Sequence, residues 1–178
     1  EQTPDKNKVA EKYCYMDKAE NCNFMGGLYT WDEMMQYENS DNNTIGETQG
    51  ICPEGWHIPT DKEWSRLADY LGGEMVAGSR MKNSVYWPGG LNHPITQSGF
   101  SAMPAGSMDV TGQYYYAGGL ASFWSASKES NSQAWQRTVT YLGAGLYRTK
   151  SHTSYRFSVR CVKDEKTKVR TLFFNFDK

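Results

Sequence analysis

The stretch Cys52–Trp64, which reads CPEGWHIPTDKEW, is the segment from which the fold of this chain can be predicted. Thr60 has the character of a helix N-cap, and Glu63 stands at the third helical position, which together make a capping box. The apolar positions that follow share one face of a helix, and they are Trp64, Leu67, Ala68 and Leu71. Two glycines follow, a common way to end a helix. We therefore predict a helix over Asp61–Leu71.

The chain before this segment repeats the pattern in a weaker form. Thr30 and Glu33 have the same capping spacing, which predicts a short helix over Thr30–Glu38. After the main helix, glycine and proline recur through residues 72–98 with little periodicity. This stretch predicts a long irregular loop, and such loops are often functional.

The second half of the chain has the pattern of short strands separated by turns. The predicted strands are Phe100–Met103, Phe123–Ser127, Trp135–Tyr141 and Tyr155–Val162. Alternation in the last of them places Cys161 on its inward face. Two helices, a long loop and then strands predict an α+β fold with a small twisted antiparallel sheet. We expect one domain over residues 13–163, a flexible segment over residues 1–12, and an extension over residues 164–178.

The extension ends in a segment with a strand pattern, Val169–Phe176, in which Leu172, Phe174 and Phe176 alternate. An uncovered strand of this kind favours aggregation, so we expect something to pair with it. The edge of the chain's own sheet is the first candidate. Exchange of the strand with a neighbouring subunit is the alternative.

The four cysteines allow three pairings if all are oxidised. We predict Cys14–Cys22, which closes a small polar loop, and Cys52–Cys161, which spans most of the domain. The alternative is four free thiols in a cytosolic protein, but Cys14 and Cys22 lie among polar residues that would leave thiols exposed. The pairing predicts an oxidising compartment, with the protein secreted or attached to a cell surface.

Composition excludes several partners. The 178 residues carry a formal net charge of −1, so no basic field attracts nucleic acid or an anionic membrane. No apolar run approaches the length of a transmembrane helix, and no leader peptide is expected in this sequence. Aromatic residues reach 14 %, and tyrosine is abundant, which is typical of a loop-rich extracellular domain.

The segment around Cys52 resembles the signature of a known family, the Fibrobacter succinogenes major paralogous domain. Other segments complete the likeness in the expected order, and they are Gly27–Trp31 after the first two cysteines, Ser98–Gly106, Phe123–Ser125 and Ser158–Val162. The likeness covers roughly Cys14 to Lys163. It implies a fold related to C-type lectins and formylglycine-generating enzymes, and a place among secreted proteins and surface lipoproteins of Bacteroidetes.

Candidate catalytic and metal-binding patterns do not hold together in this sequence. The loop that begins at Asp41 starts like an EF-hand, but Ile45 and Cys52 stand where calcium ligands are needed. Ser125–Lys128 matches S-x-x-K by chance, because no K-T-G follows. The three histidines are far apart, and His57 is interpreted as a packed turn residue. We predict no cofactor, no metal and no enzymatic activity.

Surface recognition is the function that the sequence favours. Flat rings and planar polar groups suit both glycans and protein interfaces, and the candidate binding residues are Trp87, Asn92, His93, Tyr114, Tyr115, Tyr116, Tyr147 and Arg148. The main hypothesis is a noncatalytic extracellular module that binds glycan or protein through an aromatic loop face. The alternatives are an assembly subunit of a surface appendage that docks through its C-terminal strand, and an uncharacterised enzyme on the same scaffold.

Overall fold

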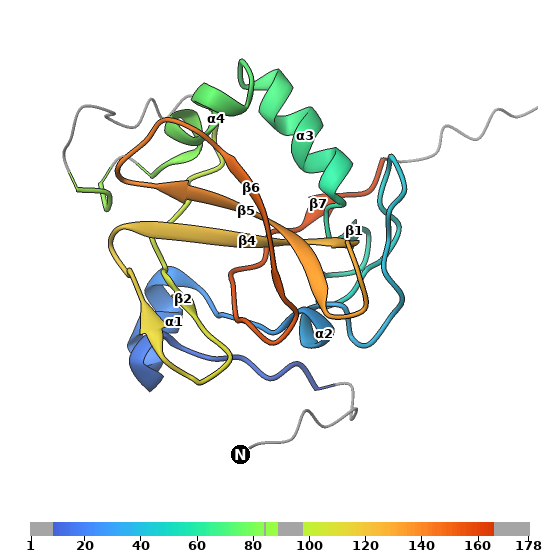
Figure 1. The fold of residues 1–178 in the computed structure, drawn as a ribbon, viewed down its shortest axis with the longest axis horizontal. Helices are drawn as coiled ribbons and strands as arrows, with labels where there is room; N and C mark the ends of the chain where they lie inside the picture. Colours follow the sequence, from blue (N-terminus) through green and yellow to red (C-terminus); the bar gives the residue numbers. More distant parts are fainter. Residues whose placement is uncertain (1–8, 84, 89–97, 166–178) are drawn as a thin grey trace, which may run out of the picture.

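The computed structural model describes residues 9–83, 85–88 and 98–165, and within them the chain folds as an α+β domain (Figure 1). The helical elements are the short η1 (Tyr15–Asp17), α1 (Ala19–Met25), α2 (Trp31–Met34), α3 (Asp61–Tyr70) and α4 (Glu74–Met81). The strands are β1 (Trp56–His57), β2 (Ser107–Met108), β3 (Tyr114–Tyr115), β4 (Leu120–Lys128), β5 (Gln133–Thr140), β6 (Tyr147–His152) and β7 (Val162–Lys163).

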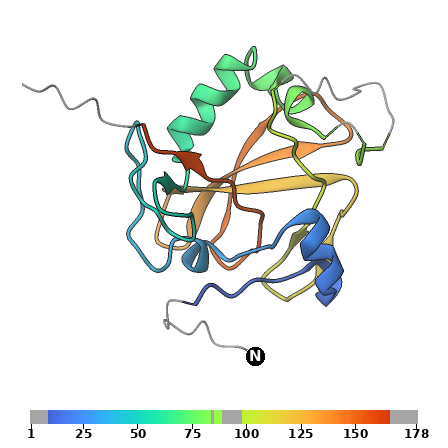
Figure 2. The ribbon, with the colours of Figure 1, turned by 180° about the vertical axis from the view of Figure 1, so that it is seen from behind.

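Three small antiparallel sheets organise the domain. The largest has the order β4-β5-β6, and the other two pair β1 with β7 and β2 with β3. Helices α3 and α4 lie together on one side of the large sheet, whereas α1 and α2 lie on the other (Figures 1 and 2). Covered from both sides, β4 is buried from Ala121 to Ser127, while β6 forms an edge whose side chains are mostly exposed. None of the helices in the described part of the chain has the length and apolar character needed to span a bilayer.

Helix α3 confirms the prediction made from its sequence. Thr60 Oγ1 accepts a hydrogen bond from the Glu63 N–H at 3.2 Å, and Glu63 Oε2 accepts one from the Thr60 N–H at 3.0 Å. This reciprocal box satisfies two of the amide groups that a helix start leaves without partners. Trp64 and Ala68 are buried against the sheet, and the two glycines after the helix adopt positive φ.

Helix α2 is shorter than predicted. Thr30 caps it by accepting from the Glu33 N–H, but the Glu33 carboxylate accepts from the Glu11 N–H at 3.0 Å and from the Tyr37 hydroxyl. The reciprocal half of the expected box is therefore not made. The chain then leaves helical geometry because Gln36 and Tyr37 have φ values of 52° and 62°.

The prediction of an irregular stretch over residues 72–98 is wrong at its start, where α4 forms. Gly78 lies inside this helix and faces the backbone of Gly145, so closely that a Cβ atom would overlap its carbonyl oxygen. Gly78 weakens the helical pattern of the sequence, but it is required here because the helix contacts the backbone at Gly145. Beyond α4, Trp87 is buried, and its indole N–H donates to the Ala102 carbonyl at 2.8 Å.

The predicted strands are confirmed in part. β4 contains the segment predicted at 123–127, and β5 contains the segment predicted at 135–141 except its last residue, Tyr141. By contrast, Phe100–Met103 makes only a single bridge, between Ala102 and Lys82. In Tyr155–Val162, isolated bridges replace a continuous strand, and only its end belongs to β7. The sequence did not predict β6, because its exposed residues have no apolar alternation. The segment Val169–Phe176 lies outside the described residues.

Both predicted disulfides are present. Cys14 is bonded to Cys22 and Cys52 to Cys161, with Cα–Cα distances of 5.0 Å and 5.8 Å. The second bond lies in a core cluster that also holds Trp31, Ile58 and Trp124. It therefore joins the segment before α3 to the residue that precedes β7, and it does so inside the packed domain.

A buried arginine connects the large sheet to helices α3 and α4. Arg137 on β5 is fully buried, and its guanidinium pairs with Asp61 of α3 and Glu74 of α4, each at 2.8 Å. The same group donates to Ser65 Oγ at 2.8 Å. Asp61 is shared with Arg148 of β6, so three elements meet at one carboxylate. The arrangement fixes the first turn of α3 relative to the sheet.

The two disulfides should differ in what they contribute to stability. Removing Cys52–Cys161 by the double substitution C52S/C161S should lower the free energy of unfolding by about 4.7 kcal/mol, because it releases a long loop in the unfolded chain. The matched variant C14S/C22S releases a loop closed over a sequence separation of 8 and should cost about 2.5 kcal/mol. Guanidinium unfolding of the two variants and the wild type measures the difference. Equal losses would contradict the predicted order.

Candidate functional site

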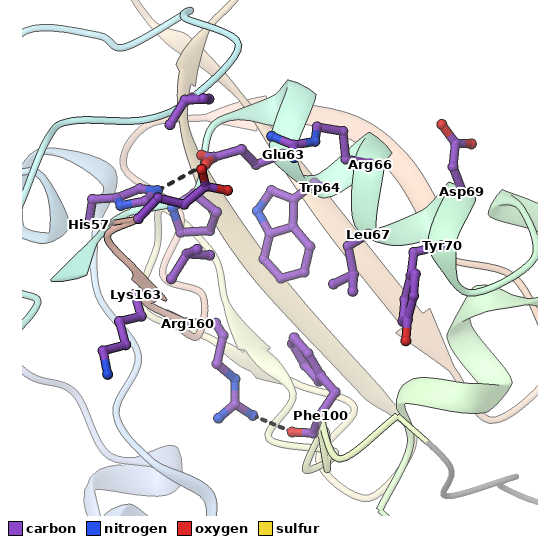
Figure 3. Close-up of a pocket in the computed structure, with 14 residues that line it drawn as sticks. His57, Glu63, Trp64, Arg66, Leu67, Asp69, Tyr70, Phe100, Arg160 and Lys163 are labelled. Carbon is purple, nitrogen blue, oxygen red and sulfur yellow. Dashed lines mark hydrogen bonds and ion pairs between the residues drawn. The ribbon is translucent and has the colours of Figure 1, made fainter. Parts of the chain in front are cut away.

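A groove of about 600 Å³ lies between α3 and the strand β7 (Figure 3). Its floor is formed by two aromatic side chains. Trp64 comes from the buried face of α3, and Phe100 comes from the loop that follows residues 89–97. The centroids of these two rings are 5.9 Å apart, and Phe123 of β4 meets Phe100 edge-on at 5.4 Å. The floor of the groove is thus continuous with the core of the domain.

The outer face of α3 forms one wall of the groove. Leu67 follows Glu63 by four residues and Tyr70 follows Leu67 by three, so these side chains lie in one row along the helix. Figure 3 shows Leu67 and Tyr70 extending from the helix on the side of Phe100. Tyr70 is 85 % exposed although it adjoins apolar side chains. An exposed ring beside a half-buried leucine leaves apolar surface open to solvent.

The opposite wall is formed by the chain around β7. Arg160 places its guanidinium over the Phe100 ring at 4.5 Å and donates to the Phe100 carbonyl at 3.0 Å. Val162, Lys163 and Glu165 continue this wall to the end of the described chain. Charges of both signs therefore surround an apolar interior, an arrangement typical of sites that orient a ligand by its polar groups and bind it by its apolar ones.

One end of the groove is closed by His57, which is only 3 % exposed. Its Nδ1 lies 2.7 Å from Asp164 Oδ1, and its Nε2 lies 3.0 Å from Glu63 Oε1. Burial opposes the charged form of the ring, but the two carboxylates outweigh it and raise the pKa of His57 above its ordinary value. Because both ring nitrogens are engaged, His57 links β1, α3 and the end of β7. His57 is packed, as the sequence indicated, but it lies in strand β1 and not in the turn before it.

The chemistry of the groove suits binding. Of the described residues that line it, none is Ser, Thr or Cys. All four cysteines are in disulfides. Within the described ranges, no group of three or more His, Cys, Asp or Glu side chains is arranged to hold a metal ion. What the groove offers a ligand is apolar contact, aromatic rings and a charged rim.

The predicted binding residues that the structure describes lie outside the groove. Trp87 belongs to the core cluster beneath α3 and α4 and is not part of the surface. Tyr114 donates its hydroxyl to Asp17 at 2.7 Å, while Tyr115 and Tyr116 are exposed at the other end of the domain, with ring centroids 6.1 Å apart. Asn92 and His93 lie outside the described residues.

The last predicted pair, Tyr147 and Arg148, lies on the exposed edge strand β6. Arg148 stacks on Trp135 at 3.3 Å and pairs with Asp61. β3 and β6 belong to different sheets, and none of the six predicted binding residues that the structure describes lines the groove. These six residues are therefore distributed over the domain.

The groove residues were missed because the sequence reveals them only indirectly. Leu67 was assigned to the core stripe of α3, Phe100 to a strand, and Arg160 to the outward face of another strand. One signal was available. Tyr70 lies three residues after Leu67 and outside the core stripe, so the apolar surface of the helix is wider than its core requires.

These features define a class of disulfide-linked α+β domain with an apolar surface groove. Comparison with protein families matches residues 1–163 to the Fibrobacter succinogenes major domain, and the chain belongs to this family. The match covers all of α1–α4 and β1–β7, and it includes every described residue that lines the groove except Glu165. Comparison with curated proteins and with solved structures gave no match.

The His57 contact predicts a specific dependence of stability on pH. Because the pKa of His57 is higher in the folded state than in the unfolded one, the imidazolium stabilises the fold below its unfolded pKa, and this contribution is lost as the pH rises through the folded pKa. His57→Gln should therefore destabilise the domain more at about pH 5.5 than at about pH 9. Urea unfolding at the two pH values measures this difference.

The exposed His152 of β6 provides the matched control. His152→Gln should leave the pH dependence of the wild type unchanged. A cost of His57→Gln that is the same at both pH values would contradict a charged His57 between the two carboxylates.

Proposed function

We propose that this domain is a noncatalytic recognition module that acts outside the cytoplasm and binds apolar side chains of a protein or peptide in the groove between α3 and β7. The observation that carries the proposal is the open apolar interior of a groove whose floor is part of the core. Monomeric proteins rarely leave such a surface exposed without a binding role. A floor fixed by Trp64 and Phe123 is also formed before any ligand arrives, which reduces the entropy that binding costs.

The two disulfides support the proposed location, because such bonds persist mainly in oxidising compartments. As part of the same proposal, the domain is displayed on or secreted from a cell of the Bacteroidetes type. Its scaffold is proposed to be related to C-type lectins.

A protein ligand fits the groove better than a sugar does. Sugars present many hydroxyl groups and are bound by a high density of planar amides and carboxylates beside a ring. The inner surface of this groove is formed by Trp64, Leu67, Phe100 and Val162, and its charges lie on the rim. Leucine and aromatic side chains of a peptide match such an interior, because each gains from leaving water.

Leu67→Asp should weaken binding by about tenfold or more, because it places a charge where an apolar side chain is expected to dock. Random peptides displayed on phage are selected against the immobilised full-length chain. The affinity of the selected peptides for wild type and variant is then measured by calorimetry. We expect the selected sequences to contain closely spaced large apolar residues.

Leu142→Asp is the matched control, because Leu142 is 75 % exposed and lies outside the groove. It should leave the affinity within twofold of the wild type. Tyr70→Ser tests the groove without a buried substitution, and unfolding curves verify that each variant is folded. Peptides that bind Leu67→Asp as well as they bind the wild type would contradict the proposal, as would a glycan array whose hits are insensitive to this change.

A further inference from the structure

We propose that the groove is occupied by the chain's own C-terminal segment, Val169–Phe176, folded back on the domain, so that a partner has to displace it. The regulatory part of this inference rests on the proposed function. The docking of the segment does not, because it depends only on the groove, on where the described chain ends and on the sequence that follows.

The described chain ends at the groove itself. Val162, Lys163 and Glu165 line it, and Glu165 is the last residue that the structure describes. Three residues, Lys166–Lys168, separate this point from the apolar segment, and they span up to about 10 Å when extended. The wall that α3 provides from Glu63 to Tyr70 is also about 10 Å long. The three linking residues are therefore long enough for the segment to enter the groove at either end of the α3 wall.

The segment has the side chains that the groove accepts. Leu172, Phe174 and Phe176 alternate along the sequence, so in extended conformation they point to one side at intervals of about 7 Å. Leu67 and Tyr70 extend from α3 on the side of Phe100 (Figure 3), so apolar side chains of the segment would meet apolar side chains of the groove. The segment over residues 1–8, by contrast, has no large apolar side chain to offer.

Docking within one chain is favoured over docking between two. A tether of three residues gives the segment an effective concentration in the millimolar range at its own groove, far above that of a second molecule in dilute solution. Docking of the segment in the groove would also cover two apolar surfaces. It covers an apolar groove, and it covers a strand-forming segment that would otherwise promote aggregation.

Photo-crosslinking in the full-length chain tests the docking. Tyr70 is replaced by p-benzoylphenylalanine, which its 85 % exposure allows without disturbing the core. The protein is irradiated at low micromolar concentration, and tryptic peptides are identified by mass spectrometry after gel separation of monomer from dimer. We expect the peptide Thr171–Lys178 to be crosslinked to the α3 peptide in the monomer band.

Two controls make the result specific. The same photoreactive residue at Tyr116, which is 70 % exposed and does not line the groove, should not capture the segment. The triple variant Leu172→Ser, Phe174→Ser and Phe176→Ser should reduce the crosslink from position 70 at least tenfold. This variant changes no described residue, so the fold is expected to remain intact.

The other outcomes would overturn the inference. Capture of the segment only in a covalent dimer would assign the groove to the segment of a second copy. No capture of residues 169–176 in a folded chain would show that the groove does not hold the segment. Neither result affects the peptide-binding test. If both proposals hold, the triple variant should bind the selected peptides at least fivefold more tightly than the wild type does.

Discussion

The Cys52–Cys161 disulfide is the constraint on which the groove and the fold both depend. It joins two segments that are 109 residues apart in sequence, and the pairing of β1 with β7 runs beside it. The chain runs from Cys52 through His57 to Trp64, which belongs to the floor and to the helix that forms one wall of the groove. The opposite wall begins at Arg160, the residue before Cys161. The disulfide therefore joins the two walls near their starts, together with the β1–β7 pairing and the contact between His57 and Asp164.

Polar contacts then fix the first turn of α3 from three directions. The capping box holds Thr60 and Glu63, Arg137 holds Asp61 from the sheet, and His57 holds the Glu63 carboxylate from β1. Negative charge at this helix end is further favoured by the helix dipole. Because the turn is fixed, the rotation of the helix is fixed too, and Leu67, which packs against the core cluster, keeps the row of side chains on its outer face in place.

The sequence predicted those parts of the fold that depend on local rules or on covalent pairing. The capping pattern gave α3, and the inward position of Cys161 gave the disulfide. It failed for α4, where Gly78 reflects a contact with Gly145 that is distant in sequence, and for β6, an exposed edge strand whose strand partner is β5. The groove was not predictable for the same reason, since its walls meet only in the folded chain.

Stability and recognition share residues in this domain, and the overlap limits how the site can vary. Trp64 belongs to the core cluster and also lies in the floor of the groove, so it cannot change without weakening the fold. Tyr70 and Arg66 lie on the exposed side of the same helix, where substitutions cost little stability. Under the proposed function, a change of ligand would therefore require changes at the rim of the groove, while Trp64 in its floor stays the same because the core depends on it.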